Sequence, residues 1–132
     1  DGIAYKEYAI ADTNEVQSVT TAAAGECDVL YIPTDNTLAS VTETVYNVVA
    51  PAKIPVIAGE EGICNGCGVA TLSISYYDLG YATGEMAYEI LAEGADITTM
   101  DVRYAPNVTK KYNAKICEEL GITVPDDYVA IQ

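Results

Sequence analysis

Hydrophobic and polar residues follow two rhythms along this chain, one typical of strands and the other of helices. Short apolar runs predict strands at residues 3–10, 28–33, 54–58, 69–75 and 101–105. Between them, apolar residues three and four apart predict helices over about 13–24, 37–50 and 77–92, with a last helix capped by Thr109. Strands that alternate with helical crossovers predict an α/β fold, namely a doubly wound, mainly parallel sheet of about five strands with helices on both faces.

Local signals define several of these elements more closely. Asp12 and Glu15 have the spacing of a capping box and open the first helix, while Pro51 stops the second. The nearly continuous apolar run 28–33 predicts a central parallel strand that is covered on both faces.

Glycine adds three further expectations. Gly94 predicts the end of the helix over 77–92. Inside that helix, Gly80 and Gly84 share one face, which predicts close packing against another backbone. The segment 59–68 is rich in glycine and is expected to be a loop.

Length and charge limit the class of protein. A chain of 132 residues fits one compact domain. Six basic against 20 acidic residues give a net charge of -14, which excludes nucleic acid and anionic membranes as favoured partners because both bind through Lys and Arg. The chain starts at Asp1, without an initiator methionine or an export signal, so we expect a piece cut from a longer protein.

Two loops are the best candidates for a binding site, because ligands of open α/β sheets bind outside the carboxyl ends of the strands. Thr34, Asp35 and Asn36 follow the second predicted strand and combine a hydroxyl, a carboxylate and an amide. This set suits a zwitterion, with Asp35 facing an ammonium group. Asp and Asn before a helix are also ordinary caps, and capping is the more frequent role.

Two further positions extend this candidate site. Glu60 follows the third predicted strand and is expected to face the same crevice as Asp35. Tyr76 and Tyr77 follow the fourth strand and either stack on an aromatic ligand or pack in the core, which is the commoner role of tyrosine pairs.

The cysteines do not form a clear metal motif. Cys64 and Cys67 make one C-x-x-C unit, but Cys27 and Cys117 do not make a second, and the chain has no histidine. We expect no metal and no cofactor. A local disulfide or free thiols are favoured over zinc and over redox catalysis.

Sequence motifs of catalysis are missing as well. The chain has no phosphate-binding glycine loop, no dinucleotide fingerprint and no G-x-S-x-G elbow, so we expect a protein that is not an enzyme. Asn107 to Thr109 matches a glycosylation acceptor, but Thr109 is interpreted as a helix cap.

Several segments, taken in order, resemble one family. The chain is similar to ABC-transporter substrate-binding proteins of the tryptophan/tyrosine type, which have a type I periplasmic-binding-protein fold. The segments that carry the resemblance are DVLYIPTDNTLAS (28–40), IPVIAGE (54–60), ATLSISYYDLGYATGEMAYEIL (70–91) and NAKICEELGITVP (113–125).

The resemblance implies a binding protein with two α/β lobes that close over a small ligand, often an aromatic amino acid, and deliver it to a membrane permease. Residues 1–132 would be the C-terminal ligand-binding lobe, with most of the first lobe absent. Thr34, Asp35 and Asn36 match the ligand-facing loop of the family, and Glu60 and residues 76–78 fall near the cleft or the crossover.

The resemblance also implies an exported protein, either periplasmic or a cell-surface lipoprotein. An oxidising exterior would permit a Cys64–Cys67 link, although relatives carry a glycine turn without paired cysteines there. The alternative function is a ligand-sensing domain of a signalling or transcription-regulating protein with the same fold.

The missing lobe leads to one expectation about the fragment itself. The helix over 77–92 would expose an apolar stripe that includes Leu79, Met86 and Ile90. We expect it to fold back onto the sheet or to pair with a second copy in a homodimer. The isolated lobe is expected to bind ligand weakly or not at all.

Overall fold

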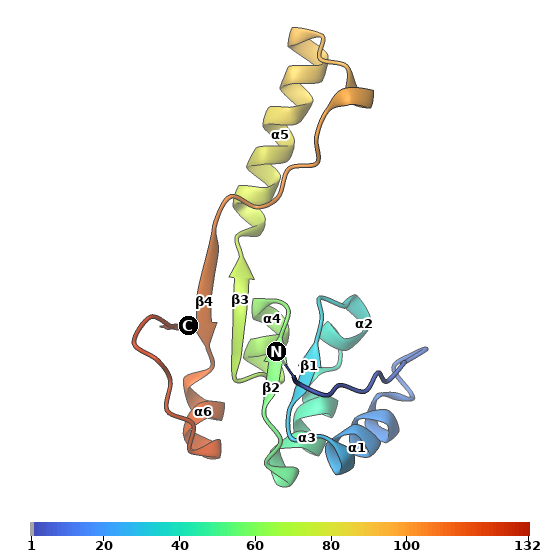
Figure 1. Ribbon diagram of the computed structural model, residues 1–132, viewed down its shortest axis with the longest axis vertical. Helices are drawn as coiled ribbons and strands as arrows, with labels where there is room; N and C mark the ends of the chain where they lie inside the picture. The colour runs from blue at the N-terminus through green and yellow to red at the C-terminus, as the bar shows by residue number, and fades with distance from the viewer. Residues whose placement is uncertain (1) are drawn as a thin grey trace.

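A computed structural model describes residues 2–132, and it has an α/β body from which a long helix projects (Figure 1). The elements, in chain order, are α1 (Val16–Glu26), β1 (Leu30–Ile32), α2 (Asn36–Ala39), α3 (Thr42–Ala52), β2 (Val56–Ala58), α4 (Glu61–Cys67), β3 (Ala70–Ile74), α5 (Tyr76–Glu93), the 3-10 helix η1 (Ile97–Thr99), β4 (Val108–Tyr112), α6 (Ala114–Leu120) and β5 (Val129–Ala130).

The five strands form one sheet in the order β1-β2-β3-β4-β5. β1, β2 and β3 are parallel, β4 runs antiparallel to β3, and β5 is parallel to β4. The predicted fold class, a mainly parallel five-stranded α/β sheet, is thereby confirmed. The central position predicted for the strand at 28–33 is wrong, since β1 lies at the edge of the sheet.

One face of the sheet carries the core. Side chains of β1 and β2, including Ile32, Val56 and Ala58, are buried there together with residues of α1, α3 and α4. A second, smaller cluster joins Val69 before β3 to α6. Side chains that alternate with the buried ones point to the other face and are exposed: Tyr31, Ile57 and Leu72. We expected helices on both faces, whereas the described helices that bury core residues lie against one.

The start of α1 differs from the prediction. Asp12 accepts a hydrogen bond from the Asn14 N–H (2.8 Å), and Glu15 accepts one from the Ala11 N–H (3.1 Å), so both side chains stabilise the turn ahead of the helix. The predicted capping box does not open the helix, because α1 begins at Val16 and its N-cap, Glu15, makes no side-chain cap bond. The predicted helix over 37–50 is instead two helices, α2 and α3, which are separated at residues 40–41.

The end of α3 and the segment 59–68 also differ from expectation. Pro51 lies within the last turn of α3, which ends one residue later and is capped by Lys53 in a left-handed conformation. The segment 59–68 contains helix α4 rather than only a loop. Gly66 allows α4 to approach α3 closely, because an added Cβ would lie 2.1 Å from the Thr42 hydroxyl oxygen.

Two predicted strands are absent. Residues 3–10 are extended but pair with no strand in the described chain, and they are held near α1 by Lys6 and Tyr8, both of which donate to Glu26. Residues 101–105 form no strand, and the fourth strand of the sheet is β4 at 108–112. The interpretation of Thr109 as a helix cap is therefore wrong, since Asn113 caps α6.

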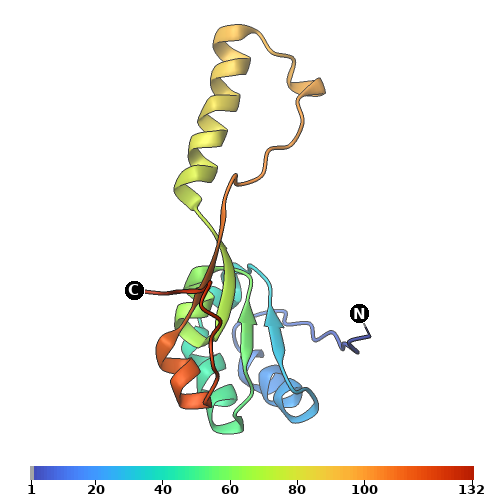
Figure 2. The same ribbon diagram turned by 60° about the vertical axis from the view of Figure 1, so that its left-hand side comes forward.

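The projecting part of the molecule, residues 76–107, is called the arm here. It consists of α5 and of the strap (residues 94–107), which returns from the tip of α5 to the sheet (Figures 1 and 2). α5 ends at Gly94, as predicted, in a left-handed conformation. It buries none of its residues and does not fold back onto the sheet. No atom lies within 4 Å of a Cβ built on Gly80 or Gly84, so the predicted close packing is not made within residues 2–132.

Candidate ligand-binding site

The carboxyl ends of β1, β2 and β3 lie at one edge of the sheet, because these three strands are parallel. Each strand end is followed at once by a polar loop or by a helix. Thr34, Asp35 and Asn36 follow β1, Glu60 follows β2, and Tyr76 and Tyr77 open the helix that follows β3. The topology therefore brings all six predicted site residues to the same edge.

The loops after β1 and β2 touch each other at Gly59. The Gly59 N–H donates to the Ile32 carbonyl (2.7 Å), and the Thr34 hydroxyl donates to the Gly59 carbonyl (3.3 Å). An added Cβ on Gly59 would lie 2.6 Å from the Thr34 nitrogen and 2.9 Å from the Pro33 carbonyl carbon. Only glycine permits this approach, so the loop at Thr34 and the segment at Gly59 are held against each other.

Asp35 is the N-cap of α2, and its Oδ1 accepts from the Leu38 N–H at 2.8 Å. The capping role that the sequence favoured is confirmed. Asp35 is partly buried, while its neighbours Thr34 and Asn36 are exposed. The bond to Leu38 fixes the orientation of the carboxylate, and in the part of the chain that the structure describes Oδ2 has no hydrogen bond.

Glu60 caps α4 in the same way. Its two carboxylate oxygens accept from the Gly62 N–H (2.7 Å) and from the Ile63 N–H. Both oxygens thus take part in shaping the first turn of α4. The Glu60 carboxylate is therefore held against the start of α4 by two hydrogen bonds.

Tyr76 and Tyr77 are the first two residues of α5, which Ser75 caps by accepting from the Asp78 N–H (3.1 Å). Their side chains are 57% and 80% exposed, so the interpretation of this pair as core is wrong. Between residues 2 and 132, no hydrogen bond joins either tyrosine to the loops at Thr34 and Glu60. They share the edge of the sheet with these loops, at the base of the arm.

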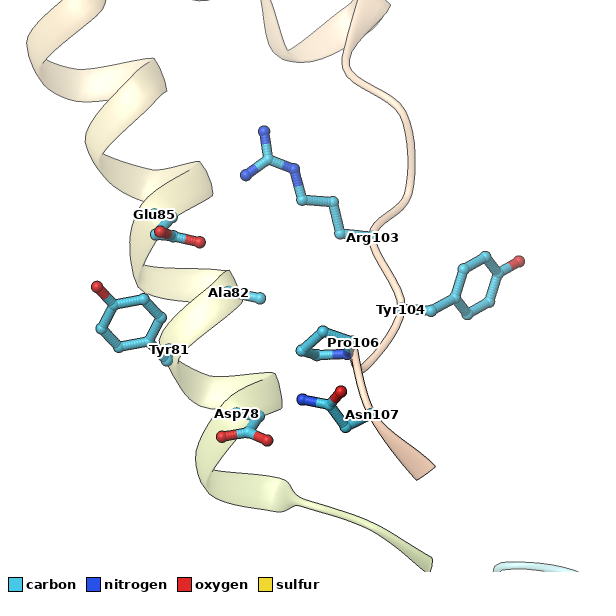
Figure 3. A pocket seen from close by; sticks show the side chains of 8 residues that line it. All are labelled: Asp78, Tyr81, Ala82, Glu85, Arg103, Tyr104, Pro106 and Asn107. Carbon is cyan, nitrogen blue, oxygen red and sulfur yellow. The ribbon is translucent and has the colours of Figure 1, made fainter. Parts of the chain in front are cut away.

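A hollow of about 410 Å³ lies in the arm between α5 and the strap (Figure 3). Pro106 and Asn107 point from the strap toward α5, while Tyr104 is turned away. Arg103 reaches α5 and donates to both carboxylate oxygens of Glu89 (2.7 and 2.6 Å). Among the predicted neighbours of the cleft, only Asp78 lines this hollow, which therefore belongs mainly to the arm.

The cysteines are free thiols, and the disulfide that the resemblance permitted is not formed. Cys64 and Cys67 lie in α4 and are buried in the main core, while Cys117 is buried in α6. Burial raises the pKa of Cys64 and of Cys67 to about 12, so both remain protonated at neutral pH. Within residues 2–132, the cysteines and carboxylates form no group that could hold a metal ion.

Sequence reasoning missed one polar group beside the site. Lys111 of β4 and Ser73 of β3 both donate to Oε2 of Glu61, the first residue of α4 (2.6 and 3.2 Å). Lys111 and Glu61 are 50 residues apart, and nothing in their local sequence indicates that they pair. The antiparallel alignment of β3 and β4 would have been needed to predict it.

An α/β lobe whose polar loops meet at the carboxyl ends of parallel strands belongs to the class of folds that bind small ligands at that edge. Residues 1–131 match the family model described as ABC transporter substrate binding protein. This chain therefore belongs to the family of ABC transporter substrate-binding proteins. Among residues 2–132, no helix combines the length and the apolar content that are needed to cross a bilayer.

Individual relatives agree with this family. A tyrosine-binding protein of Clostridioides difficile is 40% identical over 100 residues, which cover 72% of this chain and 29% of that protein. The structure is also similar to an ABC domain of Streptococcus pneumoniae in complex with L-Trp, with a TM-score of 0.86, 30% identity and coverage of 99% of this chain and 46% of that one. A ligand-free, open substrate-binding protein with adhesive properties from Clostridium difficile gives a TM-score of 0.73 at 36% identity, covering 100% of this chain and 46% of that one. The chain thus spans less than half the length of these relatives.

Proposed function

We propose that this chain is the C-terminal ligand-binding lobe of a two-lobed substrate-binding protein of an ABC importer, and that it forms one wall of a cleft for a small amino-acid-like ligand. The single observation that carries the proposal is the contact at Gly59, which joins the polar loops after β1 and β2 at the carboxyl edge of the sheet. This edge is where ligands of open α/β sheets bind.

The chemistry of the edge suits a zwitterion with an aromatic side chain. Asp35, oriented by the Leu38 N–H, offers its second oxygen to an ammonium group. Thr34 and Asn36 supply exposed polar groups beside it, Glu60 adds negative charge, and the exposed rings of Tyr76 and Tyr77 offer surfaces for stacking. Two relatives, described as tyrosine-binding and as bound to L-Trp, support an aromatic amino acid as the ligand class.

The arm packs against the other lobe in this proposal. α5 buries no residue, and its large side chains Tyr81, Tyr88 and Leu91 are exposed. Large apolar side chains that are exposed together on one element usually mark an interface. The relatives are more than twice as long as this chain, which leaves enough sequence for a second lobe that covers the arm. When the second lobe is absent, the alternative is a homodimer in which two copies of this lobe pair through the same surface.

The remaining parts of the proposal follow the family. The protein binds its ligand without catalysis, delivers it to a permease in the membrane, and is exported as a periplasmic protein or a cell-surface lipoprotein. Affinity arises from closure of two walls over the ligand and from the loss of water around it.

Calorimetric titration of the full-length gene product tests the proposal. We expect saturable binding of L-tyrosine or L-tryptophan, and no binding of L-glutamate, whose second carboxylate would meet Asp35 and Glu60. Asp35→Asn keeps a cap for α2 but removes the charge, and it should weaken binding about tenfold, as expected for a charge-assisted hydrogen bond. A full-length protein that binds none of these amino acids would refute the proposed function.

A further inference from the structure

One ion pair connects β4, the strand that follows the arm, to helix α4 beside the candidate site. Lys111 of β4 donates to Glu61 of α4 at 2.6 Å, and the hydroxyl of Ser73 in β3 donates to the same carboxylate oxygen at 3.2 Å. Ser73 is buried, and the side chains of Lys111 and Glu61 are 28% and 39% exposed. The pair is therefore partly screened from water and held by a third group.

The other ion pairs of residues 2–132 either are more exposed or lie elsewhere in the fold. Three of them have at least one lysine or carboxylate side chain that is about half exposed or more, namely Lys6–Glu26, Lys110–Asp127 and Lys115–Glu119. A fourth, Arg103–Glu89, lies inside the arm. Lys111–Glu61 is the one that joins β4 to the helix that begins at the site.

A continuous path runs from this pair to the ligand-facing loop. Glu61 follows Glu60, whose carboxylate accepts from the first-turn amides of Gly62 and Ile63. Gly59 precedes Glu60 and is in contact with the loop at Thr34. A displacement of the first turn of α4 therefore displaces the segment that meets Thr34.

The pair also balances charge at the start of α4. Glu60 and Glu61 are adjacent carboxylates at the start of a short helix, and Lys111 is the cation that neutralises one of them. Without Lys111, the Glu61 carboxylate would keep Ser73 as its hydrogen-bond donor but would lose its only cation among the described residues, next to the charge of Glu60. The first turn of α4 would then be held less firmly against β4.

We propose that Lys111 is a positioning residue for the ligand site: by pairing with Glu61 it holds the first turn of α4, and with it residues 59–60, in place against the strand that returns from the arm. This inference rests on the proposed function, because it assigns Lys111 to the same wall of the cleft. In this proposal Lys111 acts through Glu61 and not by contact with the ligand.

The test compares two neighbouring lysines of β4 in the full-length protein. Lys111→Met removes the proposed cation but keeps most of the aliphatic chain, and Lys110→Met is the matched control, because Lys110 is paired with Asp127 on the opposite face. Calorimetry gives the affinity for L-tyrosine and L-tryptophan, and amide hydrogen exchange reports on the Gly62 and Ile63 N–H groups. Lys111→Arg serves as the rescue variant.

We expect Lys111→Met to weaken binding about three- to tenfold and to speed exchange at Gly62 and Ile63. For Lys110→Met, the affinity and the exchange rates should stay within about twofold of the wild type, because an exposed ion pair contributes little. Lys111→Arg restores both values. Equal behaviour of the two Met variants overturns the inference, as does a loss of affinity without faster exchange at these amides. A wild-type protein that binds neither amino acid refutes the proposed function, and the exchange rates then still decide whether Lys111 holds the turn.

Discussion

Gly59 is the residue at which the two loops of the site meet. Its nitrogen donates to Ile32, its carbonyl accepts from Thr34, and a Cβ at this position would lie 2.6 Å from the Thr34 nitrogen. Backbone atoms cannot move aside as a flexible side chain can. The geometry of the candidate site thus depends on the absence of a Cβ at Gly59.

Gly59→Ala should separate the two loops, with a loss of about 1–3 kcal/mol in the free energy of unfolding, the usual range for overpacking. Gly25→Ala is the control, because Gly25 lies in α1 and a Cβ there meets no atom within 4 Å. Alanine favours a helix by about 1 kcal/mol over glycine, so this variant should be more stable than the wild type. Urea unfolding measures both, and a Gly59→Ala variant as stable as Gly25→Ala would contradict the close approach.

The buried thiols give a prediction at alkaline pH. An unfolded cysteine has a pKa of about 8.5, and burial raises the pKa of Cys64 and Cys67 to about 12. A raised pKa in the folded state means that the stabilisation is fully present below about pH 8 and is lost as the pH rises toward 12. The free energy of unfolding should therefore fall over this range.

The double variant Cys64→Ala/Cys67→Ala isolates this effect from the titration of tyrosines and lysines. It should be less stable at pH 7, because core volume is lost. Between pH 8.5 and 12, the pKa values of the unfolded and the folded thiols, its stability should depend less on pH than that of the wild type. Urea unfolding at a series of pH values gives the two slopes. Parallel slopes would show that these thiols are not buried as described.

Among the elements, α4 and α6 are joined by Asn113. Its Oδ1 accepts from the Ile116 N–H (3.2 Å) and caps α6, while its Nδ2 donates to the carbonyls of Asn65 (2.9 Å) and Cys64 (3.3 Å) at the end of α4. The Asn113 side chain is buried, so its polar atoms bond to these protein groups rather than to water.

Asn113→Ala should lower the free energy of unfolding by about 2–3 kcal/mol, since it removes the cap of α6 and both hydrogen bonds to α4. Asn113→Ser keeps a capping oxygen and should fall between this variant and the wild type. Asp96→Ala removes the exposed cap of η1 and should cost at most about 1 kcal/mol. Equal losses for Asn113→Ala and Asp96→Ala in urea unfolding would contradict the bridging role.

Elements with complete local signals were predictable from the sequence. α5 follows a strand, keeps helical spacing over five turns and ends at a glycine, so its bounds were predicted within one or two residues. β4 was missed because its sequence, VTKKY, is polar and mostly exposed, and it becomes a strand only by pairing with β3. α4 was missed because it contains Gly62 and Gly66, and the contact of Gly66 with Thr42 that explains one of them is tertiary.

The candidate site was predictable to a similar extent. Parallel strands place their carboxyl ends at one edge, so the gathering of Thr34–Asn36 and Glu60 follows from the order of elements. The contact between these loops at Gly59 and the pairing of Lys111 with Glu61 depend on distances between strands, which no local pattern contains. For the same reason, the sequence does not show whether Tyr76 and Tyr77 are exposed or buried.

At the scale of the whole molecule, the arm is the unusual feature. It projects from the body in both views, and it carries six of the 20 acidic residues with Arg103 as its single cation. Self-association of two such arms would bring like charges together, which favours the other lobe over a second copy as the partner. The apolar residues of α5 would then be buried within one longer chain.

Hydrogen exchange on the full-length protein and on residues 1–132 alone tests this arrangement. Peptides from α5 should exchange more slowly in the full-length protein, because burial of the helix suppresses local opening. Peptides from β1 and β2 serve as the internal control, since their buried side chains pack against α1, α3 and α4 within residues 2–132. Equal exchange of α5 in both proteins would show that the arm remains uncovered.

The most direct test of the account is a crystal structure of the full-length protein with bound L-tyrosine or L-tryptophan. We predict that the ligand lies at the carboxyl edge of the sheet, with its ammonium group within hydrogen-bond distance of Asp35 and its carboxylate or ring near Thr34–Asn36 and the start of α5. A ligand held in the hollow between α5 and the strap, away from Asp35 and Gly59, would contradict it.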